Sequence, residues 1–310
     1  MQKGLIRMRK VCLYIGFVLI AFTWMSCNED AIDKDHSIFT IDHNQYNEFD
    51  NWLLANYTYP FNIDLKYRMQ DIESDPLYNL IPADYNKSIV LSKLIKYIWL
   101  DAYTELAGPE FLRSYVPKTF LLIGSPAYSR SGVKVEGTAE GGKKITLYDI
   151  NSLNVKAIDV DLLNTRYFKT LHHEFAHILN QKRTYDTSFV NISEGKYVGN
   201  DWYFYIADNG SIYTRTNKDA WPLGFVTAYA MSEGGEDFVE NIAIYITHDQ
   251  AYWDNMLAVA GKEGAAIIER KFAIVYNYML DTWGINLTKL REIILRREQE
   301  IPVLDLNSIN

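Results

Sequence analysis

The sequence predicts an α+β fold, with a small mixed sheet in the N-terminal half and a mainly helical C-terminal half. Two observations carry this prediction. Short apolar or alternating segments with strand character lie at 61–69, 119–123, 133–135 and 144–148. Helical spacing of apolar residues dominates later, in 162–181, 233–247 and 252–300.

One helix is expected before the first of these strands, and another between the first strand and the second. Residues 44–56 have apolar side chains at helical spacing, and 87–106 does the same until Gly108-Pro109 ends it. A glycine-rich turn at 137–142 is expected to join the strands on either side of it. The aromatic stretch 185–222 shows no period, so we expect an irregular connection that lines a site.

The first 26 residues have the pattern of a lipoprotein signal peptide. Four basic residues precede the apolar run 11–24, which is too short for a comfortable membrane span. Ser26-Cys27 follows, and a small residue before cysteine is typical of the site where the cysteine becomes the lipid-modified first residue. Trp24 departs from the usual aliphatic residue at this site, and an uncleaved anchor helix is the alternative.

The domain organisation follows from that signal. Residues 27–43 are acidic and aperiodic and are expected to form a flexible tether. Residues 44–310 are expected to form one domain, with a helical subdomain from about 232 onward. We therefore expect an exported lipoprotein, held through lipid on Cys27 to an outer membrane and displayed at the cell surface.

Charge and cysteine content exclude some functions. The chain has 310 residues and a net charge of −8; without the four basic residues of the signal, 27 basic residues face 39 acidic ones, a net charge of −12. Such acidity argues against nucleic acid as a partner. The two cysteines, Cys12 and Cys27, lie in or next to the signal, so the ligands of any metal must be His, Asp or Glu.

The chemistry is concentrated in the motif His173-Glu174-Phe175-Ala176-His177. On a helix, residues i and i+4 share a face, which suits binding of one tetrahedral zinc by His173 and His177. Glu174 lies one step around the helix, where it can take a proton from a zinc-bound water. The neighbouring His172 is expected to be structural or to support a ligand. The alternative is a surface helix that carries two histidines by chance.

A third ligand has to come from elsewhere in the chain. One class of zinc peptidase would need glycine at 180 and histidine at 183, but the sequence has Asn180 and Arg183. The later helix offers four acids, of which Glu236 and Glu240 share a face. One carboxylate could bind the metal and the other could accept the Nδ1–H of a ligand histidine. Alternatively, the acids at its start, Glu233, Glu236 and Asp237, only place negative charge at the helix N-terminus, which leaves Glu240 without a role.

HEFAH, followed by GFVTAYA (224–230) and EDFVE (236–240), resembles the gluzincin metallopeptidases, which have a zincin-like fold. In particular it resembles the zinc-binding metallopeptidase lipoproteins found beside genes for TonB-dependent nutrient uptake; the lethal-factor type of protease is similar in the same segment. The resemblance implies zinc as cofactor and His173, His177 and Glu236 as its ligands. It also implies Glu174 as general base and acid, Tyr229 as donor to the oxyanion and Glu240 as partner of a ligand histidine. The strand 144–148 resembles the edge strand that aligns the substrate peptide.

We therefore expect a zinc peptidase that cleaves extracellular peptides, proteins or glycopeptides and serves nutrient uptake with a TonB-dependent transporter. The main alternative is a cell-surface binding or accessory lipoprotein with a structural or vestigial zinc site. The presence of Glu174 argues against decay, because a degenerate copy could lose it freely. A third possibility is amide hydrolysis in a glycan or cell-wall peptide, which the sequence does not distinguish from peptide cleavage.

Overall fold

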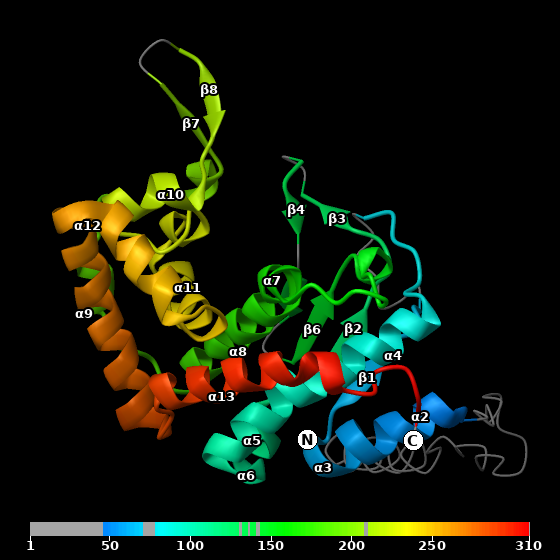
Figure 1. Ribbon diagram of the computed structural model, residues 1–310. Helices are drawn as coiled ribbons and strands as arrows, with labels where there is room; N and C mark the ends of the chain where they lie inside the picture. The colour runs from blue at the N-terminus through cyan, green and yellow to red at the C-terminus, as the bar shows by residue number, and fades with distance from the viewer. Residues whose placement is uncertain are drawn as a thin grey trace, which may run out of the picture. The chain divides into compact units, whose positions relative to one another are not determined.

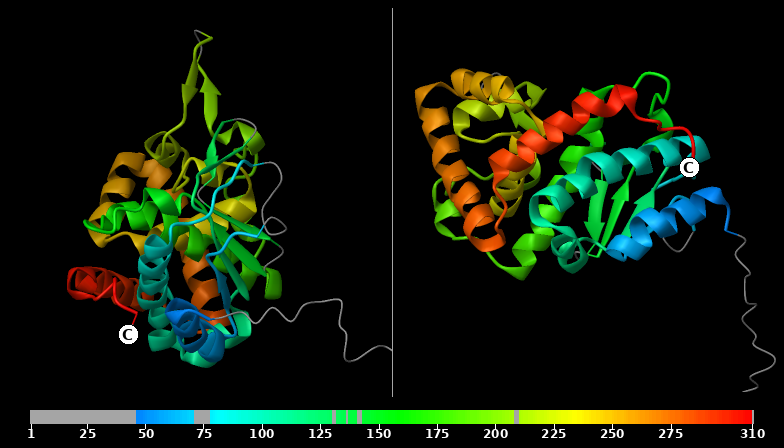
Figure 2. Two further views of the ribbon diagram at one scale, coloured as in Figure 1. Left: turned by 90° about the vertical axis from the view of Figure 1, so that its right-hand side faces the viewer. Right: turned by 60° about the horizontal axis from the view of Figure 1, so that its bottom comes forward.

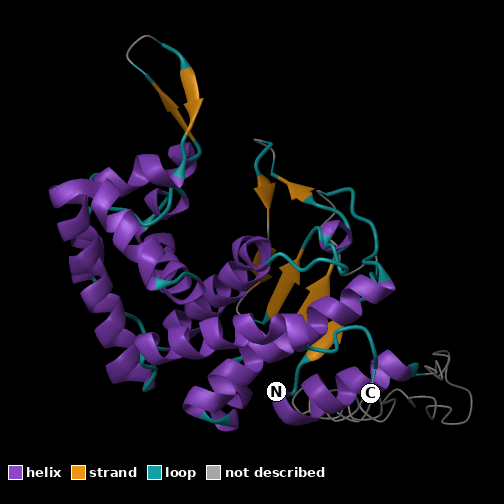
Figure 3. Cartoon of the chain, viewed as in Figure 1, coloured by secondary structure: helices purple, strands orange, loops and turns teal. Residues whose placement is uncertain are grey.

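The computed structural model describes residues 46–70, 78–129, 132–135, 137–140, 143–207 and 210–309. The predicted signal peptide (1–26), the tether (27–43) and the lipid site Cys27 lie outside the described residues. Within the described residues, no helix combines the length and apolar character that a membrane span needs. Figure 1 shows the path of the chain, and Figure 3 shows the same view by secondary structure.

The N-terminal half begins with helices, as predicted. Helix α2 (Glu48–Leu53) starts at a capping box made by Asn47 and Asp50 and continues through η1 (Leu54–Thr58) and α3 (Tyr59–Phe61). The stretch predicted at 87–106 is continuous from Asp84, which caps it, to Gly108, whose φ of 80° ends it. Its parts are α4 (Tyr85–Leu94), η3 (Ile95–Leu100) and α5 (Asp101–Ala107), and α6 (Pro109–Tyr115) follows.

A four-stranded mixed sheet lies at the centre of this half, with strand order β1-β2-β6-β5. The first three strands are parallel, and the last pair is antiparallel. This confirms the predicted small mixed sheet, although the strand expected at 61–69 is reduced to its middle three residues. The strands are β1 (Asp64–Lys66), β2 (Thr119–Leu122), β5 (Gly137–Glu140) and β6 (Lys144–Leu147).

The prediction of a glycine-rich turn at 137–142 is wrong for the part of this stretch that the structure describes. Residues 137–140 form β5, which pairs with β6 and is one edge of the sheet. The edge strand is therefore β5 and not 144–148, which lies inside the sheet. The strand predicted at 133–135 is present as β4 (Lys134–Val135), but it pairs with β3 (Ala127–Tyr128) in a separate hairpin.

The C-terminal half is mainly helical, as predicted. Gly284, with φ of 70°, separates the last two long helices. The stretch 185–222 is less irregular than expected, because it contains the hairpin β7–β8, which extends away from the helices (Figure 1). The elements are α7 (Val160–Leu163), η5 (Asn164–Phe168), α8 (Lys169–Lys182), α9 (Ser188–Asn191), η6 (Gly199–Trp202), β7 (Phe204–Ile206), β8 (Ile212–Thr214), α10 (Asn217–Ala220), η7 (Trp221–Leu223), η8 (Tyr229–Met231), α11 (Gly234–Thr247), α12 (Gln250–Asn277), η9 (Tyr278–Thr282), α13 (Leu287–Glu300) and η10 (Ile301–Val303), with η4 (Ile150–Ser152) before them.

The core lies mainly on one face of the sheet. Alternate residues of β2 and β6, such as Phe120 and Ile145, face a large cluster of buried side chains from the helices. Trp99 connects the layers, since its ring packs against Phe120 at 5.8 Å and against Phe175 of α8 at 5.5 Å. Figure 2 shows the α4–α5 stretch crossing the strands, with α13 beside it. The core thus fixes the apolar side of α8 against the sheet, and leaves its other side for chemistry.

Candidate metal centre

Helix α8 carries His173, Glu174 and His177 on its side away from the core. Phe168, Leu171, Phe175 and Leu179 are buried, as the predicted apolar stripe requires. His173 and His177 are one helical turn apart, and their ring centroids are 4.8 Å apart. The expected helix therefore presents both imidazoles together.

Helix α11 supplies the third group. The Oε2 atom of Glu236 lies 2.9 Å from His173 Nε2 and 3.3 Å from His177 Nε2, and the two nitrogens are 3.2 Å apart. A tetrahedral zinc with bonds of about 2.0–2.1 Å holds its ligand atoms about 3.3–3.4 Å from one another. The donor set thus fits zinc. Among the described residues, no other group of His, Cys, Asp or Glu is arranged to hold a metal.

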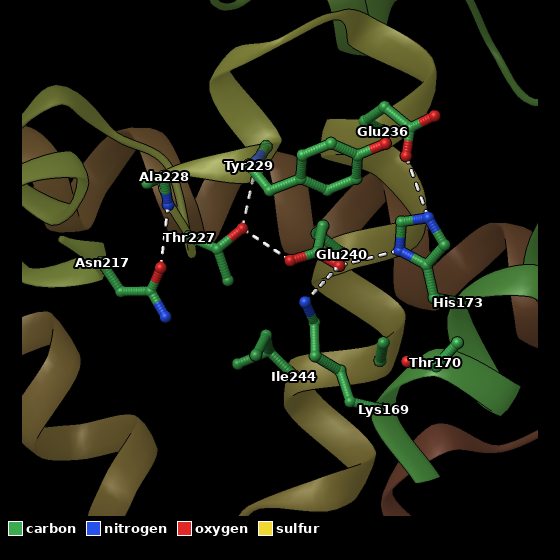
Figure 4. Close-up of polar contacts among 12 residues, drawn as sticks. Lys169, Thr170, His173, Asn217, Thr227, Ala228, Tyr229, Glu236, Glu240 and Ile244 are labelled. Atoms are coloured by element: carbon green, nitrogen blue, oxygen red, sulfur yellow. Dashed lines mark hydrogen bonds and ion pairs between the residues drawn. The ribbon is translucent and has the colours of Figure 1, made fainter. Parts of the chain in front are cut away.

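Glu240 lies one turn further along α11 and is fully buried. Its Oε1 accepts from His173 Nδ1 at 2.7 Å and from Lys169 Nζ at 2.9 Å, and its Oε2 accepts from the Thr227 hydroxyl at 2.6 Å (Figure 4). Burial opposes its ionisation, but the Lys169 ammonium and the hydrogen bonds outweigh burial and lower the pKa of Glu240 to about 2. A carboxylate that accepts from His173 Nδ1 turns Nε2 toward the ligand site.

A carboxylate as buried as that of Glu240 needs a positive partner, and a metal with its ligand histidines would be one. The structure gives part of this role to Lys169, one turn before His173 on the same helix. That cation and Thr227, two residues before Tyr229, were missed. A lysine four residues before the first histidine was a visible signal, because i and i+4 share a face.

Glu174, the motif residue expected to act as general base, lines the cavities beside the ligand atoms. Burial raises its pKa, while the nearby histidines lower it less. A carboxylate with a raised pKa accepts and returns a proton more readily near neutral pH.

Tyr229 begins the turn η8 and faces the ligand atoms. Its ring centroid lies 5.8 Å from that of His173 and 5.0 Å from that of Trp202. Burial, together with the nearby acids, raises the pKa of Tyr229 well above its usual value, so its hydroxyl stays a donor. Figure 4 shows the hydroxyl directed toward Glu236.

His172 points away from this group. It is fully buried, its Nδ1 lies 3.0 Å from the Tyr103 hydroxyl, and burial lowers its pKa to about 3. It is a core residue, in agreement with the structural role expected for it.

One interpretation of the sequence was that Asp237 only places negative charge at the helix N-terminus. Its contacts give it a further role. It is fully buried and pairs with Lys271 of α12 at 2.6 Å, and it accepts a hydrogen bond from Tyr197. Lys271 also donates to the carbonyl oxygen of Gly224, where the segment with Thr227 and Tyr229 begins. Gly224 has a φ of 87°, and a Cβ there would lie 2.3 Å from Ile267, which explains the glycine.

Two cavities meet at the ligand atoms. One, of about 680 Å³, extends past Lys169 and Thr227; the other, of about 370 Å³, extends past Ile178 and Gln181. Both border Gly137 at the start of the edge strand β5. A Cβ at this position would lie 2.5 Å from Thr170 of α8, so glycine permits the close approach of strand and helix.

Two histidines from one helix, a carboxylate from a facing helix and a glutamate beside them, all in a cleft, define a candidate metallohydrolase centre. The family model described as "Putative zinc-binding metallo-peptidase" matches residues 42–288, and the chain belongs to this family. It is similar to the crystal structure of a putative zinc-binding metallo-peptidase from Bacteroides caccae ATCC 43185. The two share 43% identity at a TM-score of 0.71, over 88% of this chain and all of that one. Among curated proteins, none matches.

Proposed function

We propose that this protein is a zinc-dependent hydrolase that cleaves peptide bonds by general-base attack of water. The observation that carries the proposal is the convergence of His173 Nε2, His177 Nε2 and Glu236 Oε2 beside Glu174. When bound, zinc would supply Lewis-acid polarisation of the scissile carbonyl and lower the pKa of water.

The protein side chains provide the remaining steps. Glu174 accepts a proton from the attacking water and passes it to the leaving amine, so one residue acts as base and then as acid. The Tyr229 hydroxyl donates to the oxygen on which negative charge develops. Glu240, which accepts a hydrogen bond from Thr227, holds His173 in place and keeps the ligand atoms fixed during the reaction.

The test is digestion of a diverse peptide and glycopeptide library by the full chain loaded with zinc. We expect cleavage that a chelator abolishes and that zinc restores. Glu174→Gln should keep zinc and reduce cleavage by about 100-fold or more, because it removes the base. Glu233→Gln is the matched control, an acid three residues before a ligand that should leave the rate unchanged. Cleavage retained by Glu174→Gln would remove the proposed mechanism, and no cleavage by the wild type would favour a binding protein.

We further propose that the chain is exported and carries lipid on Cys27, which would bring the enzyme to the cell surface and to peptides destined for uptake through a TonB-dependent transporter. The basic and apolar pattern before Cys27 supports this. In cells fed a labelled fatty acid, the protein should take up label and fractionate with the outer membrane. A Cys27→Ser variant that still incorporates label would contradict lipid attachment there.

A further inference from the structure

The larger of the two cavities beside the metal centre is lined by apolar and polar side chains, and its polar side chains include two lysines, Lys134 and Lys169. It is bordered by the start of α8, by β4 and by the 200–204 segment, and it reaches the metal centre at His173 and Glu174. Its volume of about 680 Å³ is in the range of ligand pockets, about 300–1,000 Å³. It can therefore hold substrate groups on one side of the scissile bond.

Of the lysines that line this cavity, Lys169 is the one closest in sequence to a metal ligand. It precedes His173 by one helical turn, its side chain keeps 26% of its surface exposed, and it lines the cavity. Glu240 takes one of its hydrogen bonds, at 2.9 Å. An ammonium group has three N–H donors, so Lys169 can donate to a second acceptor.

Glu240 also lines the cavity, but its side chain is fully buried and both of its oxygens already have partners. Oε1 already accepts from His173 and Lys169, and Oε2 accepts from Thr227, with the side chain fully buried. Of the two side chains, that of Lys169 is the more exposed, since it keeps 26% of its surface exposed and that of Glu240 keeps none. Lys169 and Asn217, both of which line the cavity, are drawn in Figure 4.

Other side chains of the cavity add donors. The Asn217 Oδ1 atom accepts from the Ala228 backbone N–H at 3.0 Å, which leaves the amide N–H groups as the available part of this side chain. Lys134 lines the cavity as well, and its own partner Asp149 does not. The carboxylate with capacity to accept is Glu174, at the metal end.

We infer that this cavity binds a carboxylate of the substrate and that Lys169 determines this specificity. The inference rests on the proposed function and names its substrate class. A carboxylate offers only acceptors and makes charge-assisted hydrogen bonds with ammonium and amide donors. It can come from an Asp or Glu side chain beside the scissile bond, or from the free C-terminus of the peptide.

The experiment uses the zinc-loaded full chain and four versions of one peptide that the wild type cleaves. An Asp next to the scissile bond is kept or replaced by Asn, and the C-terminus is free or amidated. We expect kcat/KM to be at least about tenfold higher for a carboxylate at one of these two places than for its neutral counterpart, about 1.4 kcal/mol. The position at which the carboxylate raises kcat/KM shows whether the cavity binds a side-chain carboxylate or the C-terminus of the peptide.

Lys169→Met should abolish that preference, to within about twofold, whatever change it makes to the rate that all four peptides share through its contact with Glu240. Lys169→Arg keeps the charge and should keep the preference. Lys182→Met, an exposed lysine on the same helix, is the matched control and should change neither rate. If Lys169 serves only to neutralise Glu240, Lys169→Met will slow all four peptides equally, and the inference is overturned. It is also overturned if the wild type shows no preference.

A binding measurement separates this inference from the proposed function. The four peptides are titrated into zinc-loaded Glu174→Gln protein, which should consume them at least about 100-fold more slowly. If the wild type cleaves nothing, the proposed function fails, but tighter binding of the carboxylate peptides that Lys169→Met removes still supports the carboxylate site. Equal binding of all four peptides would overturn the site, whatever the activity.

Discussion

Adjacent acids of helix α11 have different roles because successive side chains point in different directions. Glu236 faces the two histidines, Asp237 faces Lys271 in the core, and Glu240 returns to the metal side one turn later. The sequence showed that Glu236 and Glu240 share a face. It could not show the partner of Asp237, because Lys271 lies 34 positions away and is buried only through tertiary packing.

Replacement of Asp237 by Asn is expected to affect stability rather than zinc binding. The change leaves the ammonium of Lys271 buried without its counter-charge, which costs about 3–5 kcal/mol in comparable pairs. Urea unfolding of the zinc-loaded variant should show this loss, and Asp281→Asn, an exposed acid, should show almost none. If Asp237→Asn loses zinc while remaining folded, the ligand assignment on α11 is wrong.

Glu240→Gln is expected to weaken zinc binding. An amide holds the Nδ1–H of His173 less strongly than a carboxylate does, and loss of such a partner typically reduces metal affinity by about 10–100-fold. Competition with a chromophoric chelator measures the change, with Glu233→Gln as the matched control. Unchanged affinity would mean that Glu240 only balances Lys169.

At the scale of elements, the helices were predicted better than the strands. The long helices have several turns of apolar periodicity and clear ends, such as Gly108 and Gly284. The edge strand β5 is short and follows no alternation of apolar and polar residues, so the sequence pattern favoured a turn. Its position follows from pairing with β6 and from the close contact of Gly137 with α8. Both are tertiary contacts, which the local sequence pattern does not show.

Helix α13 contains a buried acid that should make stability depend on pH. Glu298 is 7% exposed, and burial raises its pKa to about 7, although a hydrogen bond with Asn164 lowers it in part. The native protein holds this proton more tightly than the unfolded chain, whose ordinary pKa is 4.5. The stabilisation is therefore complete below pH 4.5 and is lost as the pH rises through about 7.

Glu298→Gln should remove this dependence. We expect the wild type to lose up to about 3 kcal/mol relative to the variant between pH 5 and pH 8, at 1.36 kcal/mol for each unit of pKa shift. Unfolding free energies measured across this range provide the test. Glu292→Gln, an exposed position on the same helix, should follow the wild type; parallel curves for wild type and Glu298→Gln would show that Glu298 titrates normally.

For the whole molecule, the local part of the centre was predictable and the long-range part was not. His173, Glu174 and His177 lie within five residues, so helical geometry alone places them together. The choice of Glu236 over the other acids came from family resemblance, and the geometry agrees with it. The cavities, the contact of Lys169 with Glu240 and the pair of Asp237 with Lys271 arise from the packing of α8, α11 and α12, which no local pattern encodes.

The measurement that most directly tests the central claim is the zinc content of the purified full chain after saturation and removal of free metal. The wild type should hold about one zinc per chain. Glu236→Gln should hold less than about a tenth of that, while Asp237→Asn should keep the full amount. A wild type without zinc, or a Glu236→Gln variant that retains it, would contradict the assignment of His173, His177 and Glu236 as a zinc centre.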